Sequence, residues 1–434
     1  MKTLIIGGGL TGLACAYQLK KFNKDFLIVE KENTLGGLCR SIKKDDFIFD
    51  YTGHFLHFSD SNIKSFVFRI LKGKILSINR NSKVYTEYTN TKTHLIPFPF
   101  QANIGYLNSK YRRYCIETLI KSNFEKSKSS KNFYDWCESN FGKGITNLFF
   151  SPYNSKLFQT KIKDISTNWV KKFVPRPNIE EILYNVLFAS TKTYGYNSKF
   201  YYPKYGGIQS LIDSISSNIE YKNILLNTEV KKIDLQNKYA VLSNEQSVKY
   251  NFLVSTTPLI DLVEIANCPE KIKLLSKKLK YVSVLCFNIA LKRKVLPSIH
   301  WIYFPTKNTT FYRVGLYHNV SENLVAKNYG SIYVEISIPP KNKIDLENLK
   351  EKITIELKNT KIITSEKDIL FYNFVKIPVG YVIYDNNREK IVNEIINYFN
   401  KNNIYPVGRY GSWKYSFMEE NIKDGFSVAE KIAR

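Results

Sequence analysis

A glycine-rich segment near the start of the chain has the residue types and spacing of a phosphate-binding turn. Residues 7–12 read Gly-Gly-Gly-Leu-Thr-Gly, follow a short apolar run and open a segment with helical periodicity. Gly7 and Gly9 permit a tight turn and a close backbone approach to pyrophosphate, and Gly12 lets the helix pack closely on the preceding strand. The N-terminus of the helix adds amide donors and a positive dipole. This segment predicts a dinucleotide site.

An acidic residue follows the glycine motif at the distance that ribose recognition needs. Residues 26–29, Phe-Leu-Ile-Val, form a second apolar strand that ends at Glu30. In dinucleotide folds, a carboxylate about 20 residues beyond the glycines accepts hydrogen bonds from ribose. A second glycine turn at 34–40 brings amides and Arg40 within reach of the same diphosphate. The residues that we expect to contact the cofactor here are Gly7, Gly9, Leu10, Thr11, Gly12, Glu30, Lys31, Gly36, Gly37, Leu38 and Arg40.

The two glycine turns resemble those of glutathione-reductase-like flavoproteins of the amine oxidase and UDP-galactopyranose mutase type. The resemblance implies that the cofactor is FAD rather than NAD. It also implies that the loop at 50–54 lies against the flavin, with the carbonyl of Gly53 near N5 and His54 after it; one glycine of the usual pair is Thr52 here. The resemblance implies further FAD contacts: the backbone near Val230 would touch the adenine, and Gly408 and Arg409 would form a late turn that contacts the flavin.

One arginine within an aromatic run, with tyrosines elsewhere, suits recognition of a diphosphate. A guanidinium group offers bidentate charge-assisted hydrogen bonds, and phenol hydroxyls donate without carrying charge. Taken singly, each tyrosine is also explained as a half-buried core residue, and the arginine as a surface or ion-paired residue. The residues of this kind are Tyr303, Arg313, Tyr381 and Tyr415.

The same stretches resemble the UDP-galactopyranose mutase family, particularly its eukaryotic-type branch and related protoporphyrinogen-oxidase-like proteins. Residues 97–101, Pro-Phe-Pro-Phe-Gln, match its uridine-binding segment, which implies that Phe100 stacks on the uracil and that Gln101 bonds its edge. Asn154 and Asn197 resemble further nucleotide contacts. The arginine and three tyrosines above resemble the diphosphate ligands of the family.

Two positions depart from the family pattern. A second diphosphate arginine, which in the family comes a few residues after a tryptophan, corresponds to Phe173, after Trp169. A tryptophan after the Pro-Tyr-Asn stretch is replaced by Phe158. Lys172 or Arg176 could substitute for the missing arginine. These differences leave both the sugar and the reaction open.

The resemblance implies pyranose–furanose isomerisation of a nucleotide sugar, expected to be a UDP-sugar, at N5 of reduced FAD in the synthesis of surface-polysaccharide precursors. Arg313 and the three tyrosines would stabilise charge on the departing diphosphate. His54 is expected beside the flavin ring, either as a catalytic residue or as a loop residue. A reductant is required, and the sequence contains no second dinucleotide motif that identifies one. The alternative is an FAD-dependent oxidoreductase of the amine oxidase or protoporphyrinogen oxidase type, which has no use for diphosphate ligands.

The composition is that of a globular protein with a large positive charge. The 434 residues carry a net charge of +26, but the lysines are scattered, which argues against nucleic acid as a partner. A lysine-rich proteome, an anionic substrate or peripheral attachment to an anionic membrane each explains the charge. The six cysteines are dispersed, which argues against disulfides and a metal site and fits the cytoplasm. No apolar run approaches the roughly 20 residues of a membrane span.

The order of the predicted elements favours an α/β flavoprotein with a Rossmann domain built from discontinuous segments. The FAD-binding domain is predicted from residues 1–95, 200–258 and 393–434, a mainly helical substrate subdomain from 96–199 and a mixed β-sheet substrate domain from 259–392. Residues 75–89 have the alternation of a hairpin turning at 80–82. Helices are predicted at 111–121, 134–141, 144–150 and 179–189.

Overall fold

The computed structural model describes residues 2–125, 130–188 and 198–434, and its first layer is a five-stranded parallel sheet. In spatial order its strands are β19 (Ile404–Pro406), β13 (Phe252–Ser255), β1 (Thr3–Ile6), β2 (Phe26–Val29) and β9 (Ile224–Leu225). β1 and β2 are buried throughout, so their sequences are continuous apolar runs rather than alternating patterns. Three segments far apart in the sequence therefore form one sheet, which confirms the predicted fold class.

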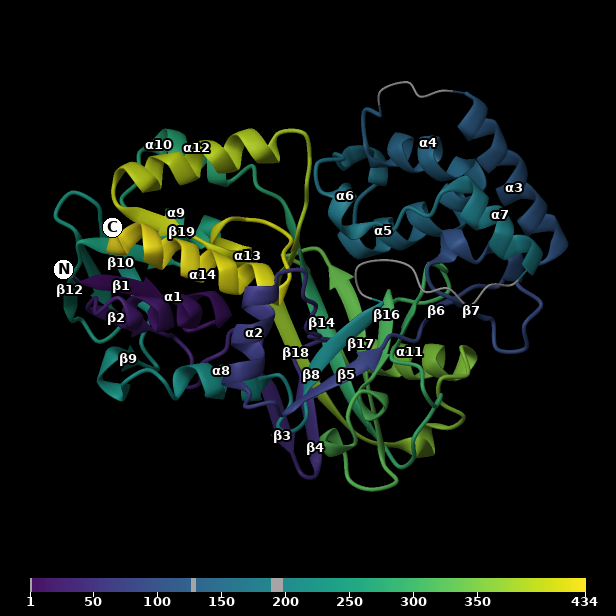
Figure 1. Ribbon diagram of the computed structural model, residues 1–434, viewed down its shortest axis with the longest axis horizontal. Helices are drawn as coiled ribbons and strands as arrows, with labels where there is room; N and C mark the ends of the chain where they lie inside the picture. Colours follow the sequence, from purple (N-terminus) through teal and green to yellow (C-terminus); the bar gives the residue numbers. More distant parts are fainter. Residues whose placement is uncertain (1, 126–129, 189–197) are drawn as a thin grey trace.

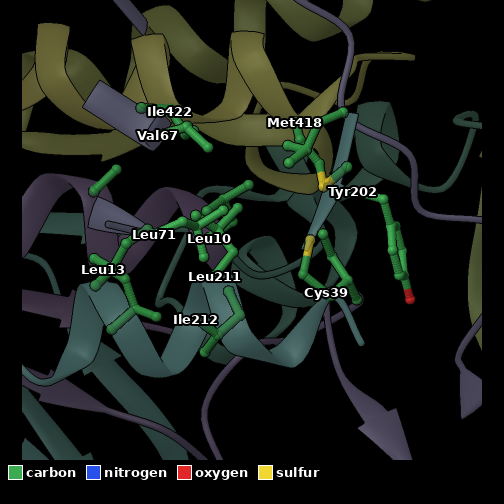
Figure 2. Close-up of a cluster of buried hydrophobic side chains, with 14 of the residues drawn as sticks. Leu10, Leu13, Cys39, Val67, Leu71, Tyr202, Leu211, Ile212, Met418 and Ile422 are labelled. Atoms are coloured by element: carbon green, nitrogen blue, oxygen red, sulfur yellow. The ribbon is translucent and has the colours of Figure 1, made fainter. Parts of the chain in front are cut away.

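The first and last long helices lie side by side on this sheet (Figure 1). α1 (Leu10–Lys21) and α14 (Met418–Ala433) approach so closely that a Cβ on Gly425 would lie 2.5 Å from the carbonyl oxygen of Thr11. α2 (Ser61–Ile70) and α8 (Gln209–Ser216) complete the core below them. Figure 2 shows the side chains that interdigitate there: Leu10, Leu13, Val67, Leu71, Leu211, Ile212, Met418 and Ile422. The other face of the sheet packs against α9 (Leu259–Ile265), α10 (Glu270–Ser276) and α12 (Arg388–Lys401).

A seven-stranded sheet forms the second layer. Its order is β18 (Ile369–Val382), β14 (Tyr281–Leu291), β17 (Gly330–Ile338), β16 (Arg313–Leu316), β15 (Trp301–Tyr303), β6 (Ser82–Tyr85) and β7 (Leu95–Pro97). Neighbouring strands are antiparallel except for β15 and β6. The register sets Tyr303 opposite Arg313, and Arg313 opposite Glu335. Residues directly opposite one another share a face of the sheet, so these three side chains form one row.

The hairpin predicted at 75–89 does not form. β5 (Ile75–Asn79) pairs with β8 (Lys199–Pro203), whereas β6 belongs to the seven-stranded sheet. Arg80, between β5 and β6, is buried, and its guanidinium group lies 5.0 Å from the ring of Phe98. The alternation that suggested a hairpin therefore comes from two strands in two different sheets, of which β6 is largely buried and β5 is only partly buried.

The helical part of the chain stands over the β6–β7 edge of the large sheet (Figure 1). Gly142 has φ +74° inside α4, and residues 146–150 form a π-helical turn instead of the separate α-helix predicted at 144–150. Phenylalanine and tyrosine side chains from these helices form a core with residues at the edge of the large sheet, among them Val84 and Ile96. The helices are α3 (Ser109–Phe124), α4 (Phe133–Ile145), α5 (Ser151–Phe158), α6 (Val170–Phe173) and α7 (Ile179–Phe188).

Smaller elements complete the fold. β3 (Ser41–Lys44) pairs with β4 (Phe47–Asp50), and β10 (Val230–Asp234), β11 (Tyr239–Leu242) and β12 (Ser247–Lys249) form an antiparallel sheet. α11 (Leu346–Asn359) packs against the large sheet, and α13 (Gly408–Gly411) follows β19. Within the described residues, no helix is both long enough and apolar enough to cross a bilayer.

Candidate functional site

A cavity of about 760 Å³ lies where the two sheets and the helical part meet. It gathers residues from both ends of the sequence and from every layer of the fold. Of the predicted site residues, those that line it are Gly7, Gly9, Leu10, Thr11, Glu30, Lys31, Gly36, Gly37, Leu38, Arg40, Gly53, His54, Gln101, Asn154, Val230, Tyr303, Arg313, Tyr381, Gly408, Arg409 and Tyr415. Gly12 and Phe100 lie behind the wall, and Asn197 falls outside the described residues.

The two predicted glycine turns pack directly on each other. The amide of Gly36 donates to the carbonyl of Gly8 at 2.9 Å, and a Cβ on Gly37 would lie 3.2 Å from the Cα of Gly9. Gly7 has φ +99°, in the region that favours glycine. A Cβ on Gly12 would lie 2.1 Å from the carbonyl oxygen of Gly7, so this glycine permits the close contact of α1 with β1.

This end of the cavity suits a pyrophosphate and a ribose. No side chain caps the N-terminus of α1, and its first turn holds no acidic residue. The free amides and the positive end of the helix dipole are therefore available to bind an anion. Glu30 is buried, and its carboxylate accepts hydrogen bonds from the amides of Gly8 at 2.7 Å and Glu32 at 3.0 Å. Glu30 thus fixes the glycine turn while it also lines the cavity. The residues present fit the adenosine diphosphate half of FAD.

Asp50, the last residue of β4, anchors the start of the loop at 50–54. The carboxylate of Asp50 accepts hydrogen bonds from the hydroxyls of Ser41 at 2.6 Å and Tyr202 at 2.7 Å and from the amide of Ile208 at 3.1 Å. Burial raises the pKa of Asp50 to about 6, although these three hydrogen bonds act in the opposite direction. The carbonyl of Asp50 accepts a hydrogen bond from the Tyr317 hydroxyl at 2.9 Å.

His54 stands on this loop as a neutral ring. Burial lowers the pKa of His54 to about 4, and the positive charges of Arg409 and Arg313 act in the same direction. Its Nδ1 lies 3.2 Å from the carbonyl oxygen of Thr52. At neutral pH the imidazole is therefore uncharged, which makes it a weak candidate for a general acid.

Tyr333 is a site residue that sequence reasoning missed. It lines the cavity from β17, and a Cβ on Gly53 would lie 2.2 Å from its hydroxyl oxygen. Gly315 makes room for the Tyr333 ring, because a Cβ there would lie 2.0 Å from it. The available signal was strand alternation, since Tyr333 is two residues from Glu335 and shares its face.

Arg313 is held by a buried carboxylate that the sequence analysis did not identify. Its Nε and Nη2 donate to Glu335 at 2.6 and 2.8 Å, and Glu335 has no exposed surface. The pair is bidentate and has no net charge, which leaves Nη1 as the guanidinium nitrogen for a ligand. Burial raises the pKa of Tyr303, beside Arg313, so its hydroxyl remains a donor.

Arg409 lies between two of the predicted tyrosines. Its guanidinium carbon is 5.4 Å from the ring centroid of Tyr381 and 4.9 Å from that of Tyr415. Its Nη2 donates to the carbonyl of Gly380 at 2.9 Å and its Nη1 to that of Ser416 at 3.2 Å. Among the residues that the structure describes, no carboxylate forms an ion pair with Arg409, so the cavity lining around it attracts anions.

The predicted nucleobase contacts need one correction. Phe100 is completely buried behind Phe149, with ring centroids 5.2 Å apart and an interplanar angle of 5°. Phe149, on the π-helical turn, presents the ring that lines the cavity. Gln101 does line it: its Nε2 donates to the carbonyl of Pro175 at 2.7 Å, while its buried Oε1 receives no hydrogen bond within the described residues. Asn154 lines it as well and donates to the carbonyl of Phe150 at 2.8 Å.

Arg176, one of the two proposed substitutes for the missing arginine, does not line the cavity. Phe173 lines it, with its ring 5.0 Å from that of Phe417. Arg176 is exposed, stacks 5.5 Å above Trp136 and donates to the side-chain oxygen of Asn140 at 2.5 Å. The side chain of Lys172 lies outside the described residues.

A Rossmann-type sheet, two glycine turns and the buried carboxylate of Glu30 beside one cavity are typical of a dinucleotide-dependent flavoprotein. The sequence pattern of the flavin containing amine oxidoreductases matches residues 10–433, and the chain belongs to that family. FAD is therefore its cofactor, and the glycine turns and Glu30 are the residues that could hold it.

Solved structures of other proteins share the fold of the whole chain. A crystal structure of reduced UDP-galactopyranose mutase superposes with a TM-score of 0.94 and 25% identity, covering 99% of this chain and 95% of the other. A putative protoporphyrinogen oxidase from Exiguobacterium sp. 255-15 shares the fold with a TM-score of 0.76 and 15% identity, over 100% of this chain and 98% of the other.

Two curated relatives match the chain over short segments. A probable flavin-containing monoamine oxidase A of Dictyostelium discoideum is 33% identical over 129 residues, which are 27% of this chain and 24% of the relative. A 4,4'-diapophytoene desaturase of Staphylococcus aureus is 44% identical over 50 residues, 12% of this chain and 10% of the relative. The matches span less than a quarter of the length of these relatives.

Proposed function

We propose that the protein is an FAD-dependent nucleotide-sugar mutase that interconverts pyranose and furanose forms of a UDP-sugar while the flavin is reduced, as a source of surface-polysaccharide precursors. The observation that carries the proposal is that Tyr303, Arg313, Tyr381 and Tyr415 line the same cavity as the two glycine turns that could hold FAD. The similarity to reduced UDP-galactopyranose mutase over 99% of the chain supports it.

Arg313 and the three tyrosines would hold a diphosphate and stabilise the negative charge that develops as the diphosphate departs. Arg313 is fixed by Glu335, so its remaining guanidinium nitrogen is oriented before a ligand arrives. Burial keeps Tyr415 protonated by raising its pKa, so its hydroxyl donates without adding charge. When bound, reduced FAD supplies the nucleophilic chemistry. The protein holds the anomeric carbon beside it, which replaces a bimolecular encounter by a local one.

The base would lie at the opposite end of the cavity. Phe149 and Tyr153 both line the cavity there and offer aromatic rings to the base; their ring planes lie at 11° with centroids 5.6 Å apart. The Oε1 atom of Gln101 is a buried acceptor whose need for a donor a uracil N–H would meet. Asn154 lies on the same wall.

A second candidate function is oxidation of an apolar substrate, of the amine oxidase or protoporphyrinogen oxidase type. Connected aromatic side chains line one side of the cavity, and Phe173 stands where the resemblance expects an arginine. An apolar substrate would suit this wall. The rings are Phe158, Trp169, Phe173, Tyr384 and Phe417.

Purified FAD-loaded protein distinguishes the two functions. UDP-galactofuranose and related nucleotide sugars are supplied with and without dithionite, and the sugars are followed by chromatography. The mutase predicts isomerisation only after reduction, with no net consumption of reductant. Release of peroxide with an amine or a porphyrinogen, without isomerisation, would instead establish the oxidoreductase.

A further inference from the structure

Lys156 makes a set of contacts that neither the predicted site nor the proposed function uses. It lies on α5, and its ammonium group donates to oxygens of the turn between β15 and β16. The acceptors are the carbonyls of Phe304 at 3.0 Å, Thr306 at 2.5 Å and Phe311 at 3.1 Å, and the hydroxyl of Thr309 at 3.0 Å. One ammonium group thus lies within hydrogen-bonding distance of four oxygens of a turn that comes about 150 residues later in the chain.

Two carboxylates hold the same turn from its other sides. Glu356 on α11 accepts hydrogen bonds from the amide and hydroxyl of Thr310, both at 2.7 Å. Glu87 accepts one from the side chain of Asn308 at 2.7 Å. Burial lowers the pKa of Lys156 to about 7, and Glu356 acts in the opposite direction. The turn is therefore held by side chains of α5 and α11 and by Glu87. Lys156 joins it to the helical part, together with an edge-to-face contact between Tyr153 and Tyr312.

The two elements that Lys156 joins carry adjoining parts of the cavity lining. α5 brings Tyr153 and Asn154 to the nucleotide end, and the turn leads from Tyr303 to Arg313. The rings of Tyr153 and Tyr303 meet edge to face, with centroids 5.5 Å apart. Lys156 itself does not line the cavity. Its contacts therefore fix the position of α5 relative to the turn, although Lys156 does not touch a ligand in the cavity.

We propose that Lys156 is a positioning residue, which holds α5 against the β15–β16 turn and thereby sets the affinity of the cavity for a nucleoside diphosphate. The identity of that ligand rests on the proposed function. The physical reason is an asymmetry: removing the ammonium group takes the side-chain donor from the carbonyls of Phe304 and Thr306, whereas that of Phe311 keeps the Thr309 hydroxyl at 3.1 Å. A carbonyl that loses its donor inside the protein regains a partner only if the turn moves toward water. The two parts of the lining would then separate where Tyr153 faces Tyr303.

The test compares FAD-loaded wild type with Lys156→Met, Lys156→Arg and the control Lys161→Met, which removes an exposed lysine close by. Methionine fills similar space without donors, whereas arginine keeps the charge and the donors. Hydrogen exchange is measured in residues 151–158 and 304–311, and UDP affinity and FAD content are measured in parallel. For Lys156→Met we expect exchange to rise at least tenfold in both segments and UDP affinity to fall at least tenfold, with FAD retained. Lys156→Arg should recover part of both losses, and Lys161→Met should match wild type.

Unchanged exchange in residues 304–311 of Lys156→Met would overturn the proposal, as would wild-type UDP affinity in a variant whose exchange has risen. If wild type itself binds no UDP, the proposed function fails, and the exchange measurement still decides whether Lys156 holds α5 against the turn.

Discussion

Phe173 packs edge-on against Tyr415, with ring centroids 4.3 Å apart and an interplanar angle of 61°. Both rings line the cavity, and Tyr415 also lies over the guanidinium group of Arg409. An apolar ring therefore occupies the position where the resemblance to UDP-galactopyranose mutases expects a second diphosphate arginine. With Arg313 already paired to Glu335, Arg409 supplies the net positive charge among these residues.

Phe173→Arg should tighten the binding of UDP. A guanidinium group beside Tyr415 adds a charge-assisted hydrogen bond, and a gain of about 1.4 kcal/mol corresponds to tenfold in affinity. Phe173→Leu is the matched control, since it shortens the apolar side chain without adding charge. Calorimetric titration of the FAD-loaded proteins with UDP measures both. Equal affinities for the arginine and leucine variants would place the diphosphate elsewhere.

Arg313→Ala should weaken UDP binding and turnover while FAD stays bound. It should also lower the free energy of unfolding by about 3–5 kcal/mol, because it strands the fully buried carboxylate of Glu335. The double variant Arg313→Met, Glu335→Leu removes both charges and should regain most of that stability without regaining UDP affinity. Denaturant unfolding and UDP titration separate the two effects. Wild-type affinity in either variant would refute a diphosphate role for Arg313.

Asp50 should make the protein less stable as the pH rises from about 4 to about 6. Its folded pKa of about 6 exceeds the ordinary value of 3.8, so the folded state holds a proton that the unfolded state has released. At about 1.36 kcal/mol per tenfold change in acidity, the loss approaches 3 kcal/mol. Asp50→Asn cannot titrate, so the stability difference between the two proteins isolates this group. A difference that does not change between pH 4 and pH 7 would contradict the buried, raised pKa.

The cofactor half of the site was accessible from sequence because its geometry is local. Glycine spacing, the apolar strand before it and the acid at Glu30 are consequences of one short β–α–β segment. The substrate half depends on packing between distant segments. Phe100 and Phe149 are both buried aromatic residues, and the π-helical turn at 146–150 decides which of them faces the cavity.

Glu335 and Lys156 show why the residues that hold a site in place are harder to predict from sequence than the residues that contact its ligand. A single glutamate in the apolar strand β17 was a visible signal, but only the register of β16 and β17 places it opposite Arg313. Lys156 is two residues from the predicted Asn154, yet its acceptors are backbone carbonyls, which carry no sequence signature.

Substitutions at Gly9 and Gly12 should have different effects: the first should abolish FAD binding, and the second should lower the stability of the fold. A Cβ at position 9 would meet no atom nearer than 3.7 Å, so Gly9→Leu should fold and extend its side chain into the cavity. That space is where the pyrophosphate of FAD is expected, and the variant should be purified without flavin absorbance. Gly12→Ala instead forces a Cβ to 2.1 Å from the carbonyl oxygen of Gly7, and the strain of overpacking should lower stability by about 1–3 kcal/mol.

Gly73→Asn serves as the control for both variants, because Gly73 has φ +71°, a Cβ there would meet no atom within 4 Å, and asparagine tolerates this backbone region. It should keep FAD and nearly all stability. Flavin absorbance per folded protein and the midpoint of thermal unfolding are measured for all three. A fully yellow Gly9→Leu protein would mean that the diphosphate does not approach the first glycine turn, and the assignment of the cofactor end of the cavity would fall with it.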